Sequence, residues 1–294
     1  MRYLSLFSGI EAASVAWEPL GWEPVAFCEI EKFPCRLLAH RFPDVPNLGD
    51  ITKIKESDII DLGHIDVVVF GSPCQDLSIG GKQKGLAGLR SGLFFKAVEI
   101  IKWAVQHCGC RYALWENVKG AFTSNKGDDF TAVVRNLSGC NDIEQPKNGW
   151  GTEGVALGDN GLLEWCVLDA QWFGLAQRRK RVFAILDTGA WYTRGPILLE
   201  PQSVSGVNPP RQETCVPVCL TARGAGSLDD RETYIVDYSG RIRHMTPLEN
   251  ERQMGFPDNW TDIPGAKDGP RYKALGNSMA VPVMRWIGKR ISPH

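Results

Sequence analysis

Residues 66 to 78 read DVVVFGSPCQDLS, an apolar run that ends at a glycine and continues into a Gly-Ser-Pro-Cys segment. Such a run followed by turn residues is typical of a buried strand in a parallel sheet. The strand leaves Cys74 directly after a proline, at its carboxyl end. The thiol of Cys74 could be a small core group, a metal ligand, half of a disulfide or a nucleophile.

The composition narrows these four roles. The chain has 294 residues, of which 43% are hydrophobic and 23% charged, as expected for a soluble globular protein of about two domains. No apolar run approaches the roughly 18 residues of a membrane span, and the first residues lack a secretion signal. Its nine cysteines are an odd number, and the close pair Cys108 and Cys110 is too tight for a usual zinc half-site. We therefore expect a reducing, cytoplasmic location, no disulfide framework and no metal.

The net charge of -1 does not by itself indicate a nucleic-acid partner. Basic residues are nevertheless clustered, at 177–181 and again at 241–244. Each cluster could be a solvated surface, but a neutral protein can bind a polyanion when its cations line one cleft.

Strand-like and helix-like patterns alternate along the first 190 residues. The strand-like runs are 3–7, 24–28, 66–70, 112–115, 163–169 and 181–186, and the helix-like runs are 10–19, 32–41, 93–107 and 130–137. This alternation predicts an α/β fold with a mostly parallel sheet. In such a fold, ligands bind at the carboxyl ends of the strands.

Two segments break this alternation. Residues 139–161 are rich in Gly, Asn and Asp, which predicts a surface loop or insertion. After about residue 188, prolines separate short strand-like pieces until a helical tail at 272–291. We expect a catalytic, cofactor-binding domain at 1–187, completed by 272–294, and a smaller domain of strands and loops at 188–271.

Polar residues follow successive strands. A Ser8-Gly9 turn comes after the first strand, and Glu29 follows the second, about 20 residues after Gly9, the spacing at which an acid accepts hydrogen bonds from a ribose. Asp50 ends the next segment and could bind an adenine amino group. Each acid alone could simply face water, but together they favour a nucleoside cofactor.

Glu116 provides the chemistry that Cys74 needs. Both residues come just after strand-like runs, so both should project over the same edge of the sheet. A thiolate is a strong nucleophile, and a carboxylic acid beside it can donate a proton if burial raises its pKa. This pairing favours a nucleophile over a core cysteine.

Several motifs now resemble one family. In order, the chain contains LFSG, GSPCQDLS, WENV, QRRKRVF, TPLENERQMGFP and GNSMAVPVM, and this series resembles the DNA cytosine carbon-5 methyltransferases of bacteria and phages. The resemblance runs from about residue 3 to 286 and is weak over 139–161 and 187–241. It implies a Rossmann-like S-adenosylmethionine-dependent methyltransferase fold with a smaller target-recognition domain.

The resemblance also implies a mechanism. Cys74 would attack carbon 6 of a cytosine flipped out of duplex DNA, and Glu116 would neutralise nitrogen 3. Asn117 would brace the loop. Of Arg179 and Arg181, which match the Gln-x-Arg-x-Arg pattern, one would contact the base or the surroundings of Cys74, and the other would pair with a carboxylate.

The remaining site residues also follow from the resemblance. The S-adenosylmethionine pocket would use Phe7, Gly9, Glu29, Ile30, Asp50, Ile51, Pro73, Leu93, Asn277 and Ser278. The candidate DNA contacts are Gln75, Ser78, Arg90, Arg178, Arg223, Arg231 and Arg243. The segment 78–95 resembles the mobile catalytic loop of the bacterial members.

The chain departs from the family pattern in two places. Ala12 and Ala13 stand where the first motif often has glycines, and Ala176 replaces the usual proline before Gln177. Two other functions stay open: an RNA cytosine methyltransferase, whose relatives commonly have two prolines before the cysteine, and a DNA-binding protein without activity. We expect a monomer in the cytoplasm of a bacterium or phage-infected cell. Its expected partner is double-stranded DNA, with no membrane contact. A restriction endonuclease could belong to the same system, without direct contact to this protein.

Overall fold

The computed structural model describes residues 1–72, 86–200, 234–236 and 242–291. A seven-stranded sheet forms its centre, in the order β2-β1-β3-β4-β7-β6-β5. The strands are β1 (Arg2–Leu6), β2 (Glu23–Cys28), β3 (Val67–Phe70), β4 (Tyr112–Val118), β5 (Glu153–Gly158), β6 (Gly161–Asp169) and β7 (Lys180–Asp187). A separate antiparallel pair joins β8 (Tyr234–Val236) to β9 (Ile242–His244).

The expectation of a mostly parallel sheet holds for one half of it. The pairings β1–β2, β1–β3 and β3–β4 are parallel, whereas β4–β7, β7–β6 and β6–β5 are antiparallel. The all-apolar sequence of β3 suits this parallel centre, because both of its faces are covered. The sheet is therefore mixed, and its antiparallel half begins at β7.

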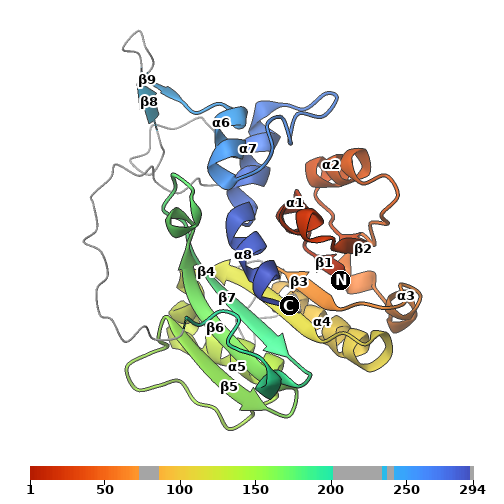
Figure 1. Cartoon of the computed structure of the whole chain (residues 1–294), viewed down its shortest axis with the longest axis vertical. Helices are drawn as coiled ribbons and strands as arrows, with labels where there is room; N and C mark the ends of the chain where they lie inside the picture. Colours follow the sequence, from red (N-terminus) through yellow and green to blue (C-terminus); the bar gives the residue numbers. More distant parts are fainter. Residues whose placement is uncertain (73–85, 201–233, 237–241, 292–294) are drawn as a thin grey trace.

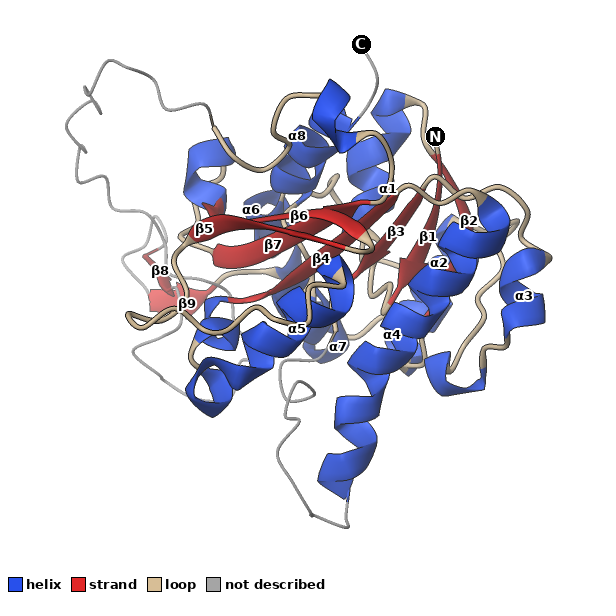
Figure 2. Ribbon diagram, turned by 90° about the horizontal axis from the view of Figure 1, so that it is seen from below, coloured by secondary structure: helices blue, strands red, loops and turns tan. Residues whose placement is uncertain are grey.

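Helices cover both faces of the sheet (Figures 1 and 2). On one face, α4 (Leu86–Cys108) and α5 (Asp128–Ser138) pack over a core that includes Phe94, Trp115 and Phe130. On the other face, α1 (Ala12–Trp17) packs against α8 (Val281–Ile291). The remaining helices are α2 (Lys32–Arg41), α3 (Glu56–Ile60), α6 (Pro247–Met254) and α7 (Asp268–Asn277). None of the helices in the described ranges is long and apolar enough to cross a bilayer.

Residues 139–161 are not only a loop, because they contain the edge strand β5. Gly154 of β5 lies against the ring of Trp165 on β6, where an added Cβ would come within 2.2 Å of the ring. Trp150 packs edge-on against Trp165 at a centroid distance of 5.6 Å. Gly154, one of the glycines that suggested a loop, is therefore needed for close contact between the strand and an indole.

Two boundaries also differ from expectation. The strand expected at 112–115 continues to Val118, because β7 pairs with it along its whole length. Glu116 and Asn117 therefore lie near the end of the strand rather than after it. The helical tail consists of two helices, α7 and α8, interrupted at residues 278–280. Pro282 at the second position of α8 fits a new helix start.

Candidate active site

The loops after β1 and β2 are tied together at the carboxyl edge of the sheet. The backbone N–H of Gly9 donates to Oε2 of Glu29 at 2.7 Å, and the N–H groups of Ile30 and Glu31 donate to its Oε1, each at 2.7 Å. Phe7 and Gly9 both have a positive φ, 55° and 57°, which turns the chain sharply after β1. The two residues that the sequence placed at one cofactor site, Gly9 and Glu29, are therefore in direct contact.

Asn47, which sequence reasoning missed, joins this pair to the third predicted contact. Its Oδ1 accepts the N–H groups of Glu29 and Gly49, at 3.0 and 3.1 Å, so the segment before Asp50 lies beside Glu29. Asp50 caps the short helix at residues 51–53 by accepting from the N–H and the hydroxyl of Thr52, and these bonds lower the pKa of Asp50.

Apolar surface lies beside these carboxylates. Ile30 is 69% exposed, although an isoleucine next to a strand end is usually covered, and Leu93 on α4 is partly buried against the core. Exposed apolar surface beside fixed carboxylates suits a nucleoside, whose base is flat and apolar and whose ribose donates hydrogen bonds. The residues present therefore fit the adenosine part of S-adenosylmethionine.

Glu116 and Arg181 form an ion pair at the middle of the same edge. They lie on adjacent antiparallel strands, diagonally across the β4–β7 ladder, and Nε of Arg181 is 3.2 Å from Oε1 of Glu116. Glu116 is 9% exposed. Burial raises its pKa, and the charges of Arg181 and Arg179 offset only part of that shift. The geometry therefore favours a carboxyl group that can hold a proton.

Arg179 holds the loop between α7 and α8. Its guanidinium is buried, and Nη2 donates to the carbonyl oxygens of Gly276 and Ser278, at 2.8 and 2.6 Å. Its own backbone N–H donates to Asp169 at the end of β6. Arg179 thereby fixes the backbone on both sides of Asn277, whose side chain is exposed, while Ser278 is buried. Of the two arginines, Arg181 is the one paired with a carboxylate.

The chain leading to Cys74 is anchored by β4. Nδ2 of Asn117 donates to the carbonyl of Ser72 at 3.1 Å, and the indole of Trp115 donates to the Ser72 hydroxyl at 3.0 Å. The contact made by Asn117 agrees with the bracing role expected for it. Gly71 lies so close to Glu116 that an added Cβ would be 3.3 Å from Oε2.

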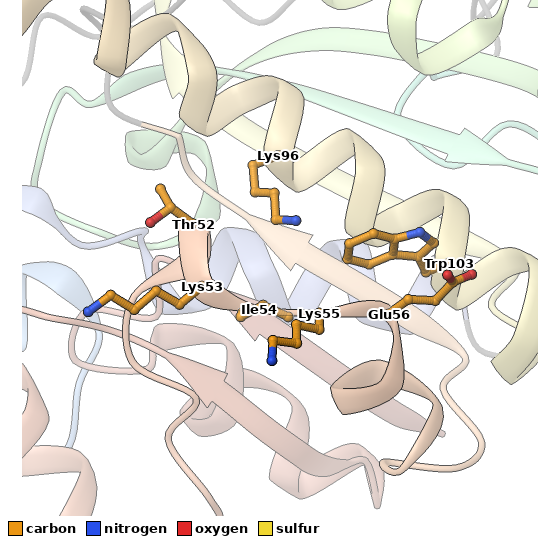
Figure 3. Close-up of a pocket in the computed structure, with 7 residues that line it drawn as sticks. All are labelled: Thr52, Lys53, Ile54, Lys55, Glu56, Lys96 and Trp103. Carbon is orange, nitrogen blue, oxygen red and sulfur yellow. The ribbon is translucent and has the colours of Figure 1, made fainter.

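A separate groove lies behind the Asp50 loop (Figure 3). Its lining comes from the segment 52–56 and from α4, namely Thr52, Lys53, Ile54, Lys55, Glu56, Lys96 and Trp103. Lys96 pairs with Glu99 at 2.6 Å and lies over the Trp103 ring, 4.4 Å from its centroid. Because this cation is already paired and no predicted site residue lines the groove, we do not place the active site there.

Comparison with known proteins assigns the family. The profile of C-5 cytosine-specific DNA methylases matches residues 1–188 and 214–293. The chain belongs to this family. Among its relatives, the Type II methyltransferase M.SsoII of Shigella sonnei is 30% identical over 331 residues, covering 99% of this chain and 79% of that protein.

This methylase is also similar in sequence to a phage protein and in structure to a solved methyltransferase. A protein of Escherichia phage P1, named DNA N-6-adenine-methyltransferase, is 28% identical over 459 residues, covering 99% of this chain, and the chain spans 61% of its length. The solved structure of a Spodoptera frugiperda DNMT2 mutant superposes with a TM-score of 0.71 at 19% identity, covering 97% of each chain. That structural likeness confirms the α/β methyltransferase fold.

Several predicted residues of this methylase lie outside the described residues: Pro73, Cys74, Gln75, Ser78, Arg223 and Arg231, together with the side chain of Arg90. Arg243, a predicted DNA contact, forms a bidentate ion pair with Glu249, at 2.8 and 2.9 Å, and its contact with DNA stays a prediction. Arg178 is exposed in the loop just before β7. The structure brings Glu116, Arg181 and Arg179 together at the edge to which Ser72 leads.

Proposed function

We propose that this protein transfers a methyl group from S-adenosylmethionine to carbon 5 of cytosine in a specific sequence of double-stranded DNA. The observation that carries the proposal is the buried ion pair of Glu116 and Arg181, next to the Ser72 segment that β4 anchors. Ser72 stands two residues before Cys74, the proposed nucleophile. Family membership supplies the reaction class.

The residues divide the reaction between them. The Cys74 thiolate forms a bond to carbon 6, the carbon 5–carbon 6 π electrons move between carbons 4 and 5, and the carbon 4–nitrogen 3 π electrons move to nitrogen 3. Glu116 donates a proton to nitrogen 3, which neutralises the charge that develops there. The cofactor supplies an electrophilic methyl group for carbon 5. Methyl transfer would leave S-adenosylhomocysteine, and nitrogen 3 then returns its proton to Glu116. Loss of the carbon 5 proton returns an electron pair that expels the thiolate and restores the aromatic ring. Arg181 keeps Glu116 oriented while its carboxylate is negative.

Among the described residues, Oε2 of Glu116 accepts no hydrogen bond, so one carboxyl oxygen is available for the base. The available oxygen of Glu116 can form its hydrogen bond with nitrogen 3. That bond is stronger in the transition state, where negative charge develops on nitrogen 3, than in the starting cytosine ring. Burial raises the pKa of Glu116, which favours the proton-donating form.

The cofactor would lie along the edge formed by β1, β2 and the Asp50 loop. We assign Glu29 to the ribose hydroxyls and Asp50 to the adenine, with Phe7, Gly9, Ile30, Ile51 and Leu93 around them. Asn277 and Ser278 would close the methionine end, at the loop that Arg179 fixes. Pro73 would border the same pocket. The division into a domain at 1–187 with 272–294, and a target-recognition domain at 188–271, belongs to this proposal.

The test uses the full chain, tritiated S-adenosylmethionine and duplex DNA. We expect label in 5-methylcytosine after nucleoside digestion and none with Cys74→Ser. Bisulfite sequencing of DNA from cells that express the protein would report the recognition sequence. Absence of label from every cytosine-containing duplex, or equal label with the serine variant, would overturn the proposal.

Two other functions are separate outcomes of the same assay. The name of the phage P1 relative raises adenine methylation, which would give N6-methyladenine in the digest instead of 5-methylcytosine. Label in transfer RNA but not in DNA would support an RNA cytosine methyltransferase. The burial of Glu116, which raises its pKa, favours cytosine, because ring attack requires a proton donor for nitrogen 3 and a reaction at an exocyclic amine does not.

A further inference from the structure

Two exposed lysines stand next to each other where β4 and β7 reach the active-site edge. Lys119 directly follows Val118, the last residue of β4, and begins the short helix η3 (Lys119–Phe122). Lys180 is the first residue of β7 and precedes Arg181, which pairs with Val118. The antiparallel register, continued by one residue beyond β4, sets Lys119 opposite Lys180, and η3 packs against β7.

This placement of two cations is unfavourable in the protein alone, because like charges opposite one another on adjacent strands repel. Both lysines are exposed, and neither forms an ion pair with any residue that the structure describes. On β6, Asp169 stands opposite Lys180. Asp169 is buried, however, and it accepts hydrogen bonds from Gln171 and from the backbone N–H of Arg179. The described part of the fold therefore gives neither lysine a counter-charge.

The same strand ends carry the pair of Glu116 and Arg181. Glu116 lies three residues before Lys119, and Arg181 directly follows Lys180. Because successive residues of a strand point to opposite faces, Lys180 points away from the face on which Arg181 meets Glu116. The two lysines thus border the base pocket without lining it, which suits a contact with the DNA backbone rather than with the target base.

We propose that Lys119 and Lys180 together bind a phosphate group of the DNA strand beside the target cytosine. This inference rests on the proposed function. A phosphate between the two ammonium groups replaces their mutual repulsion with two attractions, and lysine binds phosphate as a compact point charge. Such contacts fix the position of the duplex and carry no sequence information. The pair therefore holds the backbone from which the cytosine is rotated out, whatever the surrounding sequence.

The test measures DNA binding by Lys119→Gln with Lys180→Gln, using fluorescence anisotropy at several salt concentrations. Glutamine removes the charge and keeps a long polar side chain. We expect the slope of log K against log salt to become less steep by about two, and by about one in each single variant. At about 0.1 M salt, Kd of the double variant should rise about 10- to 100-fold. The rise should be equal for a duplex with the methylated site and for one of the same length without it.

The matched control is Lys102→Gln with Lys289→Gln, which removes two exposed lysines away from this edge. Lys102 lies in the part of α4 that leads back to the start of β4. Lys289 lies in the last turn of α8, where Gly288 meets Trp17 at the end of α1. This variant should keep the affinity and the salt slope of the wild type. Calorimetric titration with S-adenosylmethionine should give one affinity for all variants, which shows that each is folded.

The outcomes separate this inference from the proposed function. If the wild-type protein neither binds nor methylates duplex DNA, the proposed function fails. If the wild type methylates DNA and the variant of Lys119 and Lys180 keeps its Kd and salt slope, the proposed function stands and the phosphate contact is overturned. An equal loss in the control would also overturn it, because net charge alone would then explain the effect.

The cofactor provides a further outcome, because S-adenosylmethionine carries a carboxylate that lysines can also bind. If the variant of Lys119 and Lys180 lost affinity for S-adenosylmethionine and bound DNA as the wild type does, the lysines would belong to the cofactor site. That result would overturn the phosphate contact and leave the proposed function in place.

Discussion

Two buried carboxyl groups stand at the same edge of the sheet and differ in what surrounds them. Glu11, just after β1, is 1% exposed and accepts hydrogen bonds from the hydroxyls of Ser5 and Ser14 and from the backbone N–H of Ser14. Glu116, near the end of β4, is 9% exposed and meets Arg181. Both oxygens of Glu11 accept hydrogen bonds inside the fold, whereas among the residues that the structure describes only Oε1 of Glu116 has a partner.

The difference shows that the partners of a buried acid, and not its burial, decide its role. Burial raises the pKa of Glu11 to about 7, although the hydrogen bonds from Ser14 and Ser5 lower it. Burial also raises the pKa of Glu116, and here the opposing effect comes from cations. Neutral donors lock Glu11 into the loop before α1. A cation on one oxygen, and no described partner on the other, leave Glu116 able to exchange a proton with a ligand.

Replacing Glu116 tests this comparison most directly. We expect Glu116→Gln to lower kcat about 10²- to 10⁴-fold, because the amide cannot give a proton to nitrogen 3. Since the wild-type carboxyl acts in its protonated form, the wild-type rate should fall as pH rises through its elevated pKa, and this alkaline limb should vanish in the variant. Tritium transfer to DNA measured from pH 5.5 to 9 checks both effects.

Glu11→Gln is the control for that experiment. The amide keeps the size of the side chain and the acceptor for Ser14, so methyl transfer should be retained. If Glu11→Gln lost activity as strongly as Glu116→Gln, the contrast between the two acids would be wrong.

Replacing Arg179 should have the next largest effect. Arg179→Met would leave the carbonyls of Gly276 and Ser278 without their charged donor, which we expect to lower the free energy of unfolding by about 3 kcal/mol. The KM for S-adenosylmethionine should rise as the loop around Asn277 loosens. Urea denaturation and initial rates measure the two effects. Lys289→Met, an exposed cation on α8, should change stability by less than about 0.5 kcal/mol.

The sequence predicted the parallel half of the sheet better than the antiparallel half. Gly9 and Glu29 were paired from their spacing alone, and they touch at 2.7 Å. This worked because the motif is local to one strand–helix–strand unit. The strand β5 was missed, since its glycines are typical of a loop and its pairing to β6 is visible only when Trp165 lies against Gly154.

The site shows the same division between local and long-range information. The Gln-x-Arg-x-Arg pattern predicted that one of Arg179 and Arg181 would pair with a carboxylate. It did not predict that Arg181 would bind Glu116, or that the other arginine would bind the backbone near residue 277. Those partners lie on β4 and between α7 and α8, far away in the chain. Asn47 and Asp169 gave no motif at all, because their main partners are backbone groups of other segments, which the sequence does not show.

The pH dependence of stability tests the structural acid. Because the folded pKa of Glu11, about 7, lies above its unfolded value, the folded state binds the extra proton between these two values. Glu11 should therefore stabilise the folded state most below about pH 4.5. This contribution to the free energy of unfolding, up to about 3 kcal/mol, should be lost as pH rises through 7. The difference in unfolding free energy between wild type and Glu11→Gln, followed from pH 4.5 to 8.5, should show this trend. If the difference in unfolding free energy did not change with pH, the pKa of Glu11 would not be raised in the folded state.

A third acid, Glu249, extends the comparison to a solvated position and has the smallest expected effect. Its carboxylate accepts from Arg243 and from Thr246 in the capping box that starts α6, and these bonds lower its pKa to about 2, with Arg243 the main cause. Its contribution is therefore present above the unfolded pKa and is lost only as pH falls toward 2. Thr246→Ala should cost about 1 kcal/mol at neutral pH.

The start of α7 provides the control for Thr246, because Lys267 occupies the same cap position without a side-chain cap hydrogen bond. Lys267→Ala should leave the unfolding midpoint in urea unchanged, while Thr246→Ala lowers it. Equal midpoints for the two variants would show that the capping box adds nothing at this exposed site. A lower midpoint for Thr246→Ala alone would show that the hydroxyl of Thr246, which donates to Glu249 and accepts from its N–H, stabilises the start of α6.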